Sequence, residues 1–94
     1  AGRADPVPAD LSRLAHALAD QGRLDEALDA CERWLRADKL DPGAHCLHGI
    51  ILLEQQALEP ARNAIERALF LDPDLALGRH VLDDLARRRR SEQP

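Results

Sequence analysis

The sequence predicts an all-α fold in which a pair of helices recurs along the chain. When the chain is shifted by 34 residues, positions 18–38 align with positions 52–72, and nine of the 21 aligned pairs are identical. A period of this length is typical of stacked helix–turn–helix units. Trp34 and Phe70 are the only aromatic residues, and a core of alanine and leucine favours helices over strands.

The first unit is expected to contain two helices. One runs from about residue 10 to residue 21 and stops at Gly22, because glycine commonly ends helices. The other covers about 24–38, where apolar residues recur at spacings of three and four and so share one helical face.

The second unit is expected to open at Asp41-Pro42, where aspartate caps a helix and proline fits its first turn. That helix runs to about residue 55, and its partner covers about 58–71. Asp72-Pro73 is then expected to introduce a fifth helix that ends near Arg90.

Small residues at matching positions indicate where helices pack closely. Ala15 and Gly49 lie 34 residues apart on the first helices, and Ala27 and Ala61 do so on the second helices. These four are predicted repeat-packing residues, where a larger side chain would overpack the contact.

These residues resemble the tetratricopeptide repeat (TPR) pattern. Its small residue in helix one matches Ala15 and Gly49, and its alanine early in helix two matches Ala27 and Ala61. Its second alanine matches Ala68, which the resemblance adds to the repeat-packing residues, and its inter-repeat proline matches Pro73. The resemblance implies about two and a half repeats, five helices in a right-handed solenoid, with a role in protein–protein interaction. Lys39 stands where that proline is expected in unit one, so its second helix is predicted to run nearly a turn longer.

The expected division of the chain follows the repeats. The Ala-, Pro- and Asp-rich opening is typical of an interdomain linker, so we expect a piece of a longer protein. The predicted parts are a linker (1–8), a TPR domain (9–90) with repeats at about 8–41 and 42–75 and a terminal helix at about 76–90, and a tail (91–94).

A narrower resemblance concerns residues 37–56 and 65–80, which are similar to the TPR region that follows the catalytic part of CheR-type methyltransferases in bacterial chemosensory systems. It implies a parent enzyme that methylates receptor glutamates with S-adenosylmethionine. This fragment would then be a regulatory or docking domain, with no cofactor and no catalysis of its own. The alternative hypothesis is a TPR scaffold of an unrelated bacterial complex, such as a secretion or envelope assembly.

The expected partner is a protein or peptide: a chemoreceptor, a chemosensory protein or the parent's own catalytic domain. Self-association is a further expectation. The formal net charge of −4 disfavours nucleic acid, because phosphate contacts need a basic face. The sequence has no run of eighteen apolar residues, so no membrane insertion is expected. Two cysteines without a CxxC spacing indicate a reducing, cytoplasmic location.

In TPR arrays the first helices line a concave groove, and the repeat register predicts which side chains face it. Its middle is expected to be apolar and to hold an apolar peptide or an amphipathic helix. The open alternative is that these residues pack under a neighbouring helix of the same or another copy. The predicted partner groove consists of Ser12, Arg13, His16, Asp20, Cys46, Leu47, Ile50, Leu53, His80, Val81, Asp84 and Arg87.

Other reactive residues point to packing and not to chemistry. His45 and His48 share a helix face, but Cys46 points elsewhere, so no metal site is expected. His16 and Cys31 have no third group to orient them as a catalytic pair. The basic run 87–90 suits a helix C-terminus, and Trp34 is predicted to lie in the core.

Overall fold

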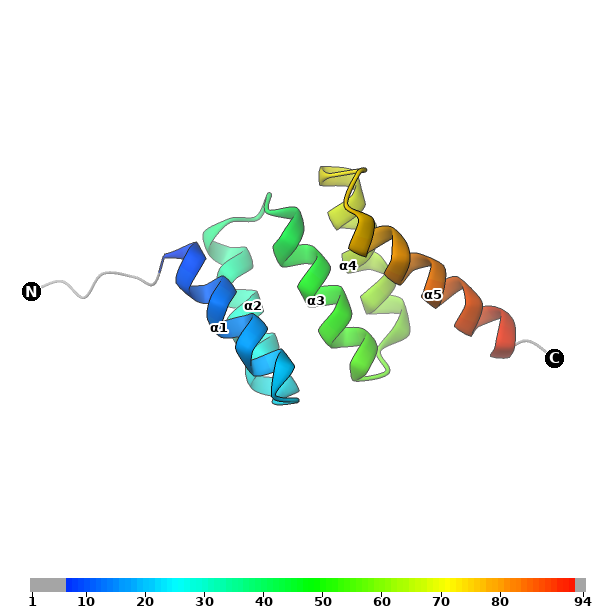
Figure 1. Cartoon of the computed structure of the whole chain (residues 1–94), viewed down its shortest axis with the longest axis horizontal. Helices are drawn as coiled ribbons and strands as arrows, with labels where there is room; N and C mark the ends of the chain where they lie inside the picture. The colour runs from blue at the N-terminus through cyan, green and yellow to red at the C-terminus, as the bar shows by residue number, and fades with distance from the viewer. Residues whose placement is uncertain (1–6, 93–94) are drawn as a thin grey trace, which may run out of the picture.

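The computed structural model describes residues 7–92, and the side chains of residues 7–89. Within this range five helices form two layers, with α1, α3 and α5 nearer the viewer in Figure 1 and α2 and α4 behind them. The fold is therefore all-α and built from recurring helix pairs, as the sequence predicts. The helices are α1 (Pro8–Asp20), α2 (Leu24–Ala37), α3 (Pro42–Glu54), α4 (Leu58–Leu71) and α5 (Ala76–Glu92).

The two second helices end in the same way. α2 and α4 each have 14 residues, so the prediction that α2 runs nearly a turn longer is wrong. Asp38 and Asp72 follow these helices with extended backbone, at φ −148° and −142°. In each, Oδ1 accepts a hydrogen bond from the backbone N–H two residues later, at 3.1 Å. This side-chain turn ends the helix whether lysine or proline comes next.

The connections into α3 and α5 differ. Asp41 caps α3, because its Oδ1 accepts a hydrogen bond from the Gly43 N–H at 2.8 Å, with Pro42 in the first turn. Asp72-Pro73 has the same sequence as Asp41-Pro42, but Asp72 is equivalent to Asp38 in the repeat. It therefore follows the end of α4 and does not cap the start of α5. α5 consequently begins only at Ala76, after a turn.

The predicted repeat-packing residues are all buried. Ala15, Ala27, Ala61 and Ala68 have no exposed surface, and a Cβ added to Gly49 would lie 2.5 Å from Cδ1 of Ile65 and 3.1 Å from the Ala61 carbonyl oxygen. Glycine at this position lets α3 and α4 approach more closely than any side chain would allow.

Two clusters of buried apolar side chains make up the core, and α3 contributes to both. The first lies between α1 and α2 and takes Leu47 and Ile51 from α3. The second lies between α4 and α5 and takes Cys46 and Leu53 from the same helix. Trp34 belongs to the first cluster and is 4% exposed, so its predicted core position is confirmed.

None of the helices described in residues 7–92 combines the length and apolar character that a membrane crossing requires.

Candidate partner-binding surfaces

The first-helix face, formed by α1, α3 and α5, carries the residues predicted to line the partner groove. On α1, Arg13, His16 and Asp20 are exposed, while Ser12 is half-buried. This end of the face is therefore polar and open to solvent.

The same face contains polar and buried side chains on α5. His80 and Arg87 are exposed and Asp84 is half-buried, whereas Val81 is only 7% exposed. Asp84 accepts a hydrogen bond from Nε of Arg88 at 2.9 Å and lies 3.8 Å from Nη2 of Arg87. These carboxylate–guanidinium contacts are exposed and contribute little to stability.

Of the two alternatives for the predicted groove residues on α3, packing under neighbouring helices applies to three of them. Cys46, Leu47 and Leu53 are between 3% and 8% exposed, so they belong to the core. The reason is that α3 packs against α2 on one side and α4 on the other, which covers most of its surface. Of the groove residues predicted on α3, only Ile50 keeps part of its side chain in solvent.

A cleft remains between α3 and α5 at this face. Its volume is about 570 Å³, and Ile50, Leu53 and Val81 from the predicted groove line it. Leu77, which is 54% exposed, adds an apolar side chain that sequence reasoning did not assign to the groove. The α3–α5 cleft is lined by Leu24, Ile50, Leu53, Glu54, Gln56, Leu77, Val81 and Arg88.

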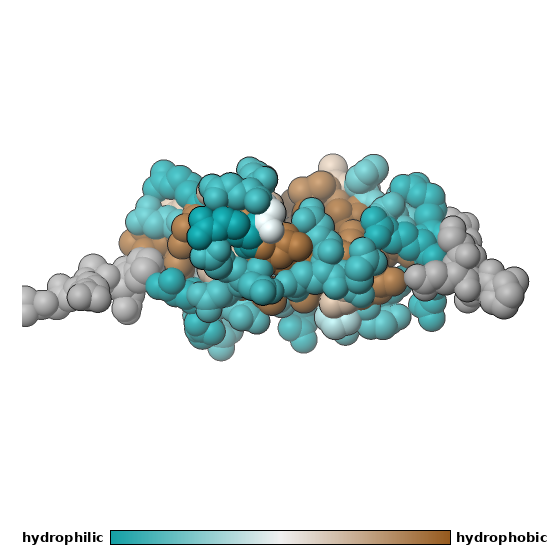
Figure 2. Space-filling view, turned by 90° about the horizontal axis from the view of Figure 1, so that it is seen from below, coloured by the Kyte–Doolittle hydropathy of each residue, from teal (hydrophilic) through white to brown (hydrophobic). Residues whose placement is uncertain are grey.

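A larger cleft lies on the opposite layer, between α2 and α4. It has a volume of about 800 Å³ and was missed by sequence reasoning. Phe70 is 87% exposed there, although helical periodicity places large apolar residues on buried faces. The α2–α4 cleft is lined by Leu35, Arg36, Lys39, Leu40, His45, Asn63, Glu66, Arg67, Phe70 and Leu71. Figure 2 shows apolar side chains, in brown, breaking the mainly polar surface on the face seen from below.

The cysteines are buried and free. The Cys31 thiol donates a hydrogen bond to the Ala44 carbonyl oxygen at 3.3 Å, and burial, with a smaller effect of Glu32, raises its pKa to about 12. Burial also raises the pKa of the Cys46 thiol. Both groups are therefore neutral thiols at physiological pH, the inert form of cysteine.

The histidines make separate contacts. The ring centroid of His16 lies 6.1 Å from that of Trp34, and the two rings are tilted by 59°, so exposed His16 lies beside a core aromatic. His45 Nε2 lies 2.8 Å from the Lys39 carbonyl oxygen, which ties α3 to the preceding loop. Burial lowers the pKa of His48. No group of three or more metal-ligating side chains occurs among the described residues.

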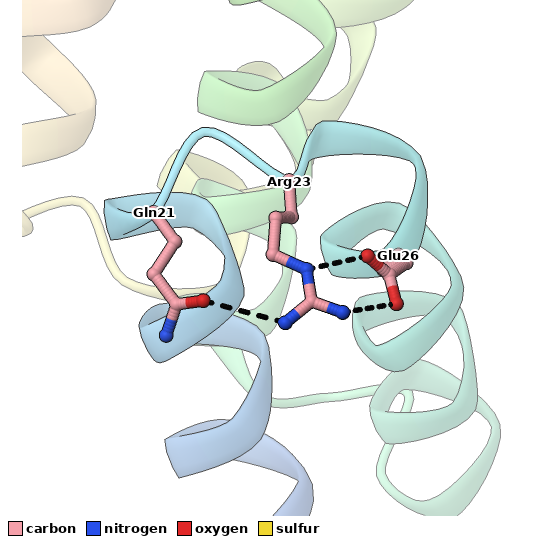
Figure 3. A network of polar contacts seen from close by, with 3 residues as sticks. All are labelled: Gln21, Arg23 and Glu26. Atoms are coloured by element: carbon pink, nitrogen blue, oxygen red, sulfur yellow. Dashed lines mark hydrogen bonds and ion pairs between the residues drawn. The ribbon is translucent and has the colours of Figure 1, made fainter.

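Polar contacts join the helices at their ends. In the α1–α2 turn, the Arg23 guanidinium donates to both carboxylate oxygens of Glu26, at 2.6 and 2.7 Å, and to Gln21 Oε1 at 3.4 Å (Figure 3). Between the repeats, Gln55 Nε2 donates to Asp25 Oδ1 at 3.0 Å. The second contact joins the end of α3 to the start of α2.

Comparison with known proteins agrees with this architecture. The family model of the tetratricopeptide repeat matches residues 8–51, which span α1, α2 and most of α3. No curated protein matches the sequence. Tetratricopeptide repeats generally mediate protein–protein interactions. The match and the recurring helix pairs together support a tetratricopeptide repeat domain.

Proposed function

We propose that this domain docks an apolar protein segment in the α3–α5 cleft. The observation that carries the proposal is the exposure of Leu77 beside Ile50, in a cleft whose floor is the buried pair Leu53 and Val81. Apolar side chains that converge in a concave site suit an amphipathic segment, because the site buries its apolar face and leaves its polar face in solvent.

We further propose that the parent chain is a CheR-type protein-glutamate methyltransferase, in which this domain has a regulatory or docking role. Support comes from the resemblance of residues 37–56 and 65–80 to the TPR region of that family. S-adenosylmethionine would bind in the parent's catalytic region, and a cytoplasmic location is part of the same proposal. The partner would be a chemoreceptor, a chemosensory protein or the catalytic region itself.

The first experiment is to read the coding sequence upstream of Ala1. A glycine-rich S-adenosylmethionine-binding fold there supports the methyltransferase proposal. A start codon near Ala1, or further 34-residue repeats, would contradict it and favour the alternative of a TPR scaffold. This fragment alone should not bind S-adenosylmethionine in calorimetry, and measurable binding would contradict the assignment of the cofactor to the catalytic region.

Docking is tested by titrating the separately expressed catalytic region, or a cytoplasmic receptor fragment, into the domain. Leu77→Glu places a charge in the α3–α5 cleft at an exposed position, so the domain should stay folded while affinity falls on the order of tenfold. Leu14→Glu, at a leucine on α1 that is 44% exposed and lines neither the α3–α5 nor the α2–α4 cleft, is the matched control. Equal affinities of wild type and Leu77→Glu would remove the α3–α5 cleft as the docking site.

A further inference from the structure

We infer that the α2–α4 cleft is a second docking surface, which binds an acidic peptide. An apolar side chain of the peptide would enter the cleft, and its carboxylates would face the basic side chains around it. This surface lies on the second helices, in the opposite layer from the α3–α5 cleft of the proposed function. The two sites share no lining residue, so either can fail without the other.

Two large apolar side chains are exposed at this cleft. Phe70 is 87% exposed and Leu40 is 73% exposed, the two highest values among the large hydrophobic residues that the structure describes. Leu35 and Leu71, which also line the cleft, are half-buried and form its apolar floor. Exposed apolar groups gathered in one concavity are typical of interaction sites.

The charge around the cleft is opposite in sign to that of the whole chain. Arg36, Lys39 and Arg67 line it, against a single acidic residue, Glu66, while the chain carries a formal net charge of −4. Within the described part of the chain, the ion pairs use Arg13, Arg23, Arg87 and Arg88, and none involves these three cations. Their charges are thus available to an acidic partner.

The alternative occupant, a second copy of this chain, fits less well. A twofold interface through the cleft would place Arg36, Lys39 and Arg67 of one copy near the same residues of the other. Like charges brought together in this way oppose association. A peptide with a leucine or phenylalanine flanked by aspartate or glutamate would contact the apolar floor with its apolar side chain. Its carboxylates would lie near Arg36, Lys39 and Arg67, which form the basic rim of the cleft.

The probe is a short fluorescent peptide with a central Leu-Phe pair flanked on both sides by glutamates, titrated with the whole 94-residue chain while anisotropy is measured. Two further peptides serve as controls: one with lysines in place of the glutamates, and one with Ser-Ser in place of Leu-Phe. We expect binding of the first peptide only, weakened by added salt because the rim is exposed.

Variants then locate the site. Phe70→Ser and Lys39→Glu should each weaken binding on the order of fivefold or more, because they remove the apolar anchor contact and a rim charge. Leu77→Ser, at an exposed leucine of the α3–α5 cleft, and Arg13→Glu, at an exposed position on α1, should leave the affinity unchanged.

Three outcomes would overturn the inference. The first is binding that is insensitive to Phe70→Ser, and the second is equal binding of the lysine peptide. The third is a wild-type dimer in sedimentation that Phe70→Ser converts to a monomer, since the cleft would then be occupied by a second copy. Loss of binding with Leu77→Ser alone would place the peptide in the α3–α5 cleft and likewise exclude the α2–α4 cleft.

Discussion

Gly22 and Gln56 lie 34 residues apart and adopt the same left-handed backbone conformation, with φ of 75° and 65°. Each follows the C-cap residue of a first helix, and the next residue donates its backbone N–H back into the helix, from Arg23 to Leu18 and from Ala57 to Leu52, both at 2.9 Å. The repeat therefore imposes a left-handed turn at this position even where the residue is not glycine.

Gln56→Gly should raise the free energy of unfolding by about 1 kcal/mol, because glycine adopts this conformation without the steric cost that a Cβ brings. The measurement is the urea midpoint of the variant against wild type. Gly22→Ala is the mirrored control: a Cβ there meets no atom within 4 Å, so only backbone strain acts, and a loss of about 1 kcal/mol is expected. A neutral Gly22→Ala would show that the turn relaxes.

Gly49→Ala should destabilise the domain by about 1–3 kcal/mol, because the new methyl group would overlap Ile65, which is fully buried and has little room to move. Ile65→Ala removes both side-chain atoms that the methyl group would meet, Cδ1 at 2.5 Å and Cγ1 at 2.7 Å. The double variant should therefore lose less stability than the two single variants summed. Strict additivity in urea unfolding would contradict the close contact between α3 and α4.

Cys31 should resist thiol reagents in the folded protein at pH 8, since its pKa is about 12 and its side chain is buried. A disulfide reagent should react with it only after urea exposes the thiol. Fast reaction without denaturant would show that the first core cluster opens readily.

The raised pKa of Cys31 also makes stability depend on alkaline pH. Above about pH 8.5 the unfolded chain loses the thiol proton while the folded chain keeps it, so stability declines from there toward pH 12. The urea midpoint should fall between pH 8 and pH 10, and by less in Cys31→Ala. An identical fall in that variant would assign the effect to other groups.

His48 should make the domain less stable in mild acid. Its folded pKa is lowered, first by burial and then by His45 and Arg67, with Glu32 opposing them. Below about pH 6.5 the unfolded chain therefore binds a proton more readily, and stability falls as pH decreases. His48→Gln should reduce the loss between pH 7.5 and pH 5.5, whereas His80→Gln, at an exposed position, should not.

The sequence predicts the helices well because their signals are local. Gly22, the Asp41-Pro42 pair and the spacing of small residues each act within one helix or turn, and the observed helix bounds lie within about two residues of most expectations. The prediction that Asp72-Pro73 starts the fifth helix is wrong, because the same dipeptide begins α3 at Asp41-Pro42 but follows the end of α4 at Asp72-Pro73. Only the 34-residue alignment of Asp72 with Asp38 distinguishes the two.

The candidate surfaces were harder to predict because exposure depends on neighbouring helices. Leu47 and Ile50 are three residues apart on α3, yet Leu47 is buried against the first repeat and Ile50 is partly open. Phe70 aligns with Arg36 one repeat earlier, and that polar equivalent was the one signal of its exposure. The α2–α4 cleft joins residues from two repeats, and no local pattern describes it.

The sharing of α3 between both core clusters makes the two repeats interdependent. A fragment that ends before Pro42 would expose Trp34 and Cys31 to water, because α3 covers both in the first core cluster. A fragment that begins at Pro42 would in turn expose Leu47 and Ile51. Neither half keeps a complete interior. The domain should consequently melt in one cooperative transition.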